Sequence, residues 1–332
     1  MAAIVSIRSA ACRFPERRQR VDTLFREEGA SFPAETAKKL GVESVRLCDG
    51  ETGSALALEA ARDALERADV DASTIDVIVD FSILPQEYLV PAWNMSNKLQ
   101  HELGATGAFT LGFSGGGATN FLVALKAAAD LIRCDERVNT ALLVAADATL
   151  PGNRILNPDA PVIVLGDGAS AMLLQGDAPG PRVLDVELWS DGDYHDVCFI
   201  PGGALAHPDR PDLYRLTLDR DRFEAAPKWE TLDRIAAAVL ARAGRARDER
   251  TAFVYPNLSA HDREAFMDAF ALDPSRAVHA PFSEHGHVQG SDFVRNYLAL
   301  VEARADGDTA LLCSHGMGFM YGVGLLAFDS PT

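Results

Sequence analysis

Short apolar runs alternate with amphipathic stretches along the whole chain. Runs rich in Val, Ile, Leu and Phe, with the length of buried strands, occur in the first part at residues 2–11, 73–83, 107–113 and 140–150. Between them, apolar positions three and four residues apart predict helices at 54–68, 92–104 and 118–133. Ser54 is expected to cap the first of these helices, and Gly104 to end the second. Strands that alternate with helices predict an α/β fold with helices packed on sheets.

The second part of the chain repeats this rhythm. The expected elements are strands at 183–192 and 251–259, helices at 228–244 and 291–305, and a strand, glycine turn and strand at 308–328. A similar unit, two strands around a Gly-Asp-Gly turn, is expected to close the first part at 162–176. The repeated order suggests two duplicated halves, 1–176 and 177–332.

The composition fits a large globular core and an acidic surface. Of the 332 residues, 48% are hydrophobic, and the formal net charge is −17. Such a surface disfavours nucleic acid and anionic membranes as partners. The main local exception is the group Arg17, Arg18 and Arg20. It is either a solvated surface stretch or a contact for phosphopantetheine, CoA or an acyl carrier protein.

Cysteine usage and hydropathy point to a reducing cytoplasm. The five cysteines are Cys12, Cys48, Cys134, Cys198 and Cys313. They form no CxxC pair and no metal-ligand spacing, which argues against a disulfide framework. The N-terminal stretch lacks the long apolar region of a signal peptide, and no uninterrupted apolar run approaches the ~18 residues of a membrane span. No metal, flavin, nicotinamide or pyridoxal phosphate motif stands out, so no permanently bound cofactor is expected.

The stretch FTLGFSGGGATNFL at 109–122 is a candidate for chemistry. A strand-like run ends in glycines, and a long Ala/Leu-rich helix follows. A nucleophile commonly stands at such a strand-to-helix elbow. Ser114 is the one nucleophilic side chain between Thr110 and Thr119. The alternative is a turn serine that satisfies a backbone group.

Four stretches in order resemble the ketoacyl-ACP synthase III family of the thiolase superfamily. They are GVESVRLCDG with the segment up to residue 83, LGATGAF with the elbow, LGDGASAMLL at 165–174, and SHGMGFMYGVGLL at 314–326. The resemblance spans nearly the whole chain. It implies a thiolase-like fold with two βαβαβαββ halves in five layers, α-β-α-β-α, and usually a homodimer. It also implies substrates that are acyl thioesters of CoA or of an acyl carrier protein.

The chain departs from this family at each catalytic position. The family places a Cys at the start of its central helix, where the helix dipole and backbone N–H groups stabilise thiolate and oxyanion. Alignment without gaps puts Gly117 in this slot, and a shift of three residues puts Ser114 there. The family's His in a Pro-His-Gln-Ala-Asn loop corresponds to Asn257, and its later Asn corresponds to His287.

The spacing of His287 and Asp292 resembles a variant branch of the family that transfers acyl groups to oxygen or other non-carbon acceptors. In that branch a nucleophile, a His and an Asp five residues further on form a triad, and some polyketide-priming members use Ser as nucleophile. The resemblance therefore implies Ser114, His287 and Asp292 as catalytic residues. A His oriented by a carboxylate is what a serine nucleophile needs.

Other groups around this site have two interpretations each. The turn at Gly318 and the elbow amides are expected to form the oxyanion hole, and Asn257 is a candidate hydrogen-bond donor. Asp292 is alternatively only the N-terminal anion of helix 291–305, with Ser291 as a competing cap. His285 is an alternative base. His315 either lines the pocket or lies on the surface.

These residues predict an acyltransferase of specialised-metabolite, polyketide-type biosynthesis. It would load an acyl group from acyl-CoA or an acyl carrier protein onto Ser114 and pass it to a small-molecule acceptor. One alternative has Gly117 in the slot, with His287 activating the acceptor for direct attack and no covalent intermediate. Another is a non-catalytic partner of an active paralogue. Claisen condensation is disfavoured, because the family's Cys and His are both replaced.

Overall fold

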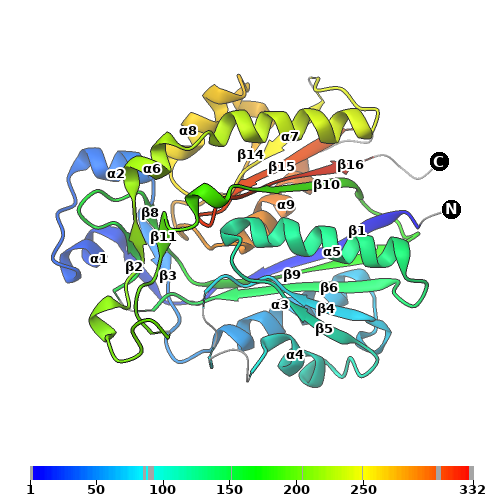
Figure 1. Cartoon of the computed structure of the whole chain (residues 1–332). Coiled ribbons are helices and arrows are strands. Elements are labelled where there is room, and N and C mark those ends of the chain that lie inside the picture. Colours follow the sequence, from blue (N-terminus) through cyan, green and yellow to red (C-terminus); the bar gives the residue numbers. More distant parts are fainter. Residues whose placement is uncertain are drawn as a thin grey trace.

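A computed structural model describes residues 3–84, 87–88, 93–150, 152–203, 205–248, 250–303 and 308–328 (Figure 1). A ten-stranded mixed sheet organises the fold. Its strands are β1 (Val5–Arg13), β4 (Val77–Asp80), β5 (Phe109–Gly112), β6 (Thr140–Asp147), β9 (Gly168–Gly176), β10 (Arg182–Ser190), β13 (Thr251–Val254), β14 (Ala277–Val278), β15 (Thr309–His315) and β16 (Met320–Ala327). Three two-stranded pairs stand apart: β2 (Arg18–Arg20) with β3 (Ser44–Arg46), β7 (Ile155–Leu156) with β8 (Ile163–Val164), and β11 (Cys198–Phe199) with β12 (Thr217–Leu218).

The large sheet has two arms of equal strand number. The order β14-β13-β15-β16-β10-β1-β9-β6-β4-β5 puts strands of the second part on one side and strands of the first part on the other. The arms meet at β1 and β10, which pair antiparallel at Ser6 and Arg182. Within each arm the outer strands run parallel: β4 pairs with β5 and β6, and β13 pairs with β14 and β15. β9 ends at Gly176 and β10 begins at Arg182.

Helices cover both outer faces and fill the space between the arms (Figure 1). They are α1 (Val21–Glu27), α2 (Ala34–Leu40), α3 (Gly53–Ala68), α4 (Met95–Leu103), α5 (Asn120–Cys134), α6 (Arg220–Ala225), α7 (Lys228–Arg242), α8 (Ala260–Ala269) and α9 (Ser291–Ala303). From bottom to top, Figure 1 shows five layers. They are α3 with α4, the sheet arm of the first part, α5 with α9, the sheet arm of the second part, and α7 with α8. Phe121 of α5 stacks on Phe293 of α9, with ring centroids 5.1 Å apart. Strands covered on both faces read as continuous apolar runs, and every residue of β6 is buried.

Local signals fixed several element ends and missed others. Helix α3 begins at Gly53, and its cap is Thr52, whose side chain accepts a hydrogen bond from the Ala55 amide at 3.2 Å. The expected cap Ser54 is wrong, because it lies inside the first turn. Gly104 does end α4, in the left-handed conformation at φ +74°. Residue 2 of the strand expected at 2–11, residue 92 of the helix expected at 92–104, and residues 304–305 of the helix expected at 291–305 lie outside the described residues.

Candidate active site

Two cavities adjoin one another and share Ile163 and Leu258 in their walls. The inner cavity has a volume of about 220 Å³ and is lined mainly by apolar side chains. These include Ile83, Leu84, Leu156, Leu165, Leu216 and Met317. Its polar side chains are His287, Gln289, His315 and the thiol of Cys198. An apolar cavity with a few convergent polar groups is the usual form of a small-molecule site.

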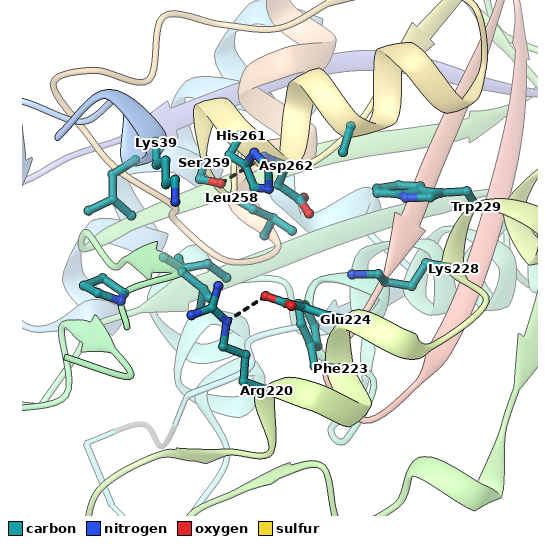
Figure 2. Close-up of a pocket in the computed structure, with 15 residues that line it drawn as sticks. Lys39, Arg220, Phe223, Glu224, Lys228, Trp229, Leu258, Ser259, His261 and Asp262 are labelled. Carbon is teal, nitrogen blue, oxygen red and sulfur yellow. Dashed lines mark hydrogen bonds and ion pairs between the residues drawn. The ribbon is translucent and has the colours of Figure 1, made fainter. Parts of the chain in front are cut away.

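The outer cavity is larger, about 420 Å³, and carries more charge (Figure 2). Its charged side chains are Lys39, Arg220, Lys228, Glu224 and Asp262. Arg220 pairs with Glu224, with 2.6 Å between Nε and Oε1. Lys228 is buried, and its Nζ lies 4.0 Å from the centroid of the Phe223 ring. Burial lowers the pKa of Lys228, and the nearby carboxylates of Asp262 and Glu224 oppose this shift.

His287 and Asp292 form a buried pair at the wall of the inner cavity. Nδ1 of His287 lies 2.6 Å from Oδ2 of Asp292, and the two side chains are 5% and 0% exposed. Burial works to raise the pKa of Asp292, but His287, Arg295 and the Val288 amide hold it below its ordinary value. Because Nδ1 is engaged, Nε2 is the ring nitrogen left for a substrate, and no described residue hydrogen-bonds it. The predicted pairing of these two residues is thus present as a contact, and its catalytic role is taken up below.

The main chain holds His287 in place through the Gly-Asp-Gly turn. The His287 amide donates to the Val164 carbonyl at 2.9 Å, and the Gly166 amide donates to the His287 carbonyl at 3.0 Å. Next in the turn, the buried carboxylate of Asp167 accepts from both Nη atoms of Arg154, at 2.8 and 2.9 Å. These hydrogen bonds tie the turn to the segment that presents His287 to the cavity.

The elbow before α5 brings Gly117 into the cavity wall. Gly117 has a φ of +55°, and a Cβ built on it would lie 3.0 Å from both the Cα of Gly316 and the amide nitrogen of Met317. A Cβ on Gly316 would meet the carbonyl oxygen of Gly116 at 1.8 Å. The elbow and the turn at 316–318 therefore pack backbone against backbone. A side chain at Gly117, one of the two candidates for the family's Cys position, fits only if the turn at 316–318 moves by a few tenths of an ångström.

Ser114 lies outside this arrangement. Its side chain is exposed, and it is not among the described residues that line the inner cavity. The structure therefore does not bring Ser114 together with His287 and Asp292, although all three were predicted to act together. The reason is the glycine run, since Gly115 and Gly117, and not the serine, reach the cavity.

Two other predicted residues have structural partners instead of the cavity. Asn257 and Asn296 exchange amide hydrogen bonds at 3.1 and 3.2 Å, and Asn257 is absent from the described lining of the inner cavity. This placement does not fit the donor role predicted for Asn257. His285 packs edge-on against Phe14, with 4.5 Å between ring centroids, and it does not line the inner cavity either. Burial lowers its pKa to about 4, so it does not fit the role of an alternative base.

Sequence reasoning missed one cavity residue and left a second open. Cys198 lines the inner cavity, but burial raises the pKa of its thiol to about 12, which leaves it protonated. His315, at the end of β15, is buried and lines the inner cavity, which excludes its surface interpretation. No sequence signal marked Cys198, because it lies in the two-residue strand β11, far along the chain from the elbow.

The N-terminal arginine group is paired with carboxylates on the protein surface. Arg17, Arg18 and Arg20 are exposed, and each lies within 3.3 Å of a carboxylate oxygen, on Asp49, Glu284 and Asp22 respectively. Among the described residues, no group of three or more His, Cys, Asp or Glu side chains has a metal-binding arrangement. A membrane-spanning helix is likewise not found among them.

Solved ketosynthase structures match this fold over almost its whole length. The 3-oxoacyl-(acyl carrier protein) synthase III of Pseudomonas aeruginosa PAO1 superposes with a TM-score of 0.81 at 22% identity, over 99% of each chain. The acyltransferase ChlB3 gives 0.81 at 21% identity, over 99% of this chain and 98% of that one. The priming β-ketosynthase of a polyketide biosynthetic pathway gives 0.81 at 23% identity, over 99% and 98%. The predicted thiolase-like α/β fold is confirmed.

Sequence comparison narrows this class to a family. Residues 116–192 match the family described as 3-oxoacyl-[acyl-carrier-protein (ACP)] synthase III. Over 305 residues the chain is 30% identical to the beta-ketoacyl-[acyl-carrier-protein] synthase III of Rhodospirillum centenum, covering 87% of this chain and 88% of that protein. Over 295 residues it is 29% identical to that of Nitratidesulfovibrio vulgaris, covering 85% of each. The chain belongs to the beta-ketoacyl-acyl carrier protein synthase III family.

Proposed function

We propose that this protein transfers an acyl group directly from a thioester to a small-molecule acceptor, with His287 as the general base and without an acyl-enzyme. The observation that carries the proposal is the pairing of a His–Asp dyad with a side-chain-free elbow in one cavity. At Gly117, one of the two candidates for the family's nucleophile position, a Cβ would lie 3.0 Å from the turn at 316–318, which disfavours a side chain there. The hydroxyl of Ser114, the predicted nucleophile, is exposed, and Ser114 is not among the described residues that line the cavity.

One general base accounts for every proton moved in the direct transfer. The acceptor nitrogen or oxygen attacks the thioester carbonyl carbon while Nε2 of His287 takes its proton. Asp292 holds the other ring nitrogen and stabilises the imidazolium that forms. When the tetrahedral oxyanion collapses, the C–S bond breaks and the imidazolium returns the proton to the leaving sulfur.

Backbone amides at the turn are available for the oxyanion. Met317 and Gly318 both line the inner cavity, and neither amide has a hydrogen-bond acceptor among the described residues. Preorganised N–H donors aimed at a developing negative charge are a major source of rate enhancement in acyl transfer. Gly318, predicted for this role, keeps it in the proposal, and Gly117 lines the same cavity without a side chain.

The donor is proposed to be acyl-CoA or an acyl carrier protein. Its phosphopantetheine arm would enter through the outer cavity, where Lys39, Arg220 and Lys228 supply cations for phosphate (Figure 2). The acyl group would then occupy the apolar inner cavity beyond the shared wall of Ile163 and Leu258.

The setting is proposed to be specialised-metabolite, polyketide-type biosynthesis. Decarboxylative condensation needs the family's Cys and His, and this chain has neither at those positions. At the level of fold alone, the likeness to the acyltransferase ChlB3 and to a priming ketosynthase supports the same view. The working assembly is proposed to be a homodimer. Light scattering on the purified protein tests this, and a monomeric mass would contradict it.

Intact-mass spectrometry combined with CoA release tests the mechanism. The protein is incubated with acyl-CoAs from acetyl to octanoyl, with and without primary amines and alcohols. We expect CoA release that depends on the acceptor, with no mass gain on the protein. His287→Ala should lower this rate by about 10²–10⁴-fold.

Matched variants separate the alternatives. His285→Ala changes a half-buried His outside the cavity and should leave the rate unchanged. An acyl adduct that Ser114→Ala or Cys198→Ala removes, and that passes to the acceptor, would overturn the direct route. No transfer from any donor would instead support a partner subunit without chemistry of its own.

A further inference from the structure

A second imidazole faces the inner cavity, and its hydrogen bonds lead out of it. Nε2 of His315 lies 2.6 Å from the hydroxyl oxygen of Tyr255. That hydroxyl donates to Oδ2 of Asp262 at 2.8 Å. Asp262 is half-buried and lines the outer cavity (Figure 2). The three side chains thus form a continuous hydrogen-bonded series from the inner cavity to the outer one.

The direction of these hydrogen bonds fixes the tautomer of His315. Because Tyr255 gives its one proton to Asp262, the Tyr255 oxygen accepts from Nε2–H of His315. Nδ1 of His315 then carries a lone pair, and it is buried without a hydrogen-bond partner among the described residues. A buried, unpartnered nitrogen is costly, and His315 lines the inner cavity, so this nitrogen is a candidate partner for a group bound there.

We infer that His315, Tyr255 and Asp262 form a proton relay that deprotonates an incoming ammonium, so that the acceptor of this enzyme is a primary amine. This inference rests on the proposed direct transfer. An amine reaches the site mainly as R–NH₃⁺ and must lose two protons to become an amide nitrogen. The relay takes the first, and His287 takes the second during attack and returns it to the leaving sulfur. An alcohol acceptor needs only one base.

The relay step balances without forming an imidazolium. Nδ1 of His315 accepts the ammonium proton while Nε2–H passes its proton to the Tyr255 oxygen. Tyr255 at the same time passes its own proton to Asp262, which becomes the neutral acid. Asp262 then releases that proton to solvent in the outer cavity. The sum is R–NH₃⁺ plus thioester giving amide, thiol and one released proton. Once the products leave, proton exchange with water restores the starting tautomer of His315.

The charged surroundings suit this direction of transfer. Burial, with Lys228 and His287 nearby, lowers the pKa of His315 to about 3, which disfavours an imidazolium but permits a change of tautomer. Burial raises the pKa of Asp262, against Lys228, Tyr255, His261 and His287, which lower it. Burial and Asp262 raise the pKa of Tyr255 well above its ordinary value, with Cys313 adding to the shift, so it keeps a proton to pass on.

Tyr255→Phe interrupts the relay with little change of shape. The ring keeps its stack on Phe266, whose centroid lies 4.5 Å away. The readout is CoA release from acyl-CoA with two acceptors at pH 7: n-butylamine, which is almost all ammonium, and hydroxylamine, which is mostly uncharged. We expect butylamine transfer to fall about 10²-fold or more. Hydroxylamine transfer should be unchanged, because it needs only His287.

The pH profile gives a second readout that a purely structural role would not move. As pH rises toward the pKa of an alkyl ammonium, about 10, free amine enters directly and the deficit of Tyr255→Phe should disappear. Asp262→Asn, which cannot take up the proton, should show the same split. Tyr321→Phe removes a buried hydroxyl that has no hydrogen-bond partner among the described residues, and it is the matched control.

The outcomes separate the relay from the proposed function. Equal loss with both acceptors, or no loss with either, in both Tyr255→Phe and Asp262→Asn overturns the relay. Wild-type protein that acylates alcohols but not butylamine overturns it as well. Hydroxylamine transfer that survives His287→Ala contradicts the proposed function instead, whatever the relay variants show.

Discussion

Asp292→Asn tests the dyad most directly, since the change is nearly isosteric. Each carboxylate oxygen of Asp292 faces two N–H donors. Oδ2 accepts from the His287 ring at 2.6 Å and from the Asn257 amide at 2.9 Å. Oδ1 accepts from the Val288 amide at 3.2 Å and from Arg295 at 3.3 Å. An asparagine must therefore turn its NH₂ group toward two donors in either orientation.

Both orientations of the amide remove the base function. If the NH₂ group faces His287, it donates to Nδ1 and forces the ring proton onto Nε2, which then has no lone pair for the acceptor. If it faces Arg295, His287 keeps its tautomer but loses the charge that stabilises its imidazolium. A triad aspartate changed in this way costs about 10⁴-fold, so we expect kcat/KM to fall about 10³–10⁴-fold, or about 4–5.5 kcal/mol.

Stability should fall as well, because Arg295 loses its carboxylate. Arg295 is 5% exposed, and removing one partner of a buried ion pair costs about 3–5 kcal/mol. The assay is CoA release at subsaturating donor, with urea denaturation of the same samples. Asp76→Asn is the control, since Asp76 accepts the Asn139 and Thr140 amides far along the chain from the dyad. A folded Asp292→Asn protein that loses less than about tenfold would refute the orientation argument.

Three further predictions concern stability and the glycine contact. Burial raises the pKa of Asp147 to about 7 from an unfolded value of 3.8. Because the folded pKa is the higher one, the free energy of unfolding falls as pH rises from about 4 to about 7. Asp147→Asn should remove this pH dependence. Urea denaturation at pH 8 should show the variant to be more stable than wild type by roughly 2–4 kcal/mol. Equal pH slopes in the two proteins would contradict this. Gly316→Ala would press its Cβ into the Gly116 carbonyl and should abolish acyl transfer. Gly192→Ala is the control, because the space around Gly192 is open, and it should keep full activity. A fully active Gly316→Ala protein would show that the turn is free to move. Gly117→Cys should lower the free energy of unfolding by about 1–2 kcal/mol through its positive φ, and it should form no acyl adduct by intact mass.

Much of the fold was predictable because its signals are local. The Gly-Asp-Gly turn between apolar runs predicted β8 and β9, and helical spacing predicted α3, α5, α7 and α9. Helix α8 was missed because, of its ten residues, only Phe266 is buried, so little apolar periodicity marks it. Its position matters for the site, since it carries Asp262.

The site was predictable only where its parts are close in sequence. His287 and Asp292 are five residues apart, on a loop and the first turn of α9, so their contact followed from the spacing. Whether Ser114 or Gly117 reaches the cavity depended on the placement of a gap within a glycine run, which carries no sequence signal. The hydrogen bond between Asn257 and Asn296, which are 39 residues apart, likewise could not be predicted from the sequence, because it depends on tertiary contacts.

The contact between the elbow and the turn has a consequence for any redesign of this site. The two glycine segments are about 200 positions apart in sequence, yet each fills the space that a side chain on the other would need. A substitution in one segment therefore requires a movement or a second substitution in the other. The elbow and the turn at 316–318 act as one packing unit, so engineering a nucleophile into the elbow also requires redesign of the turn.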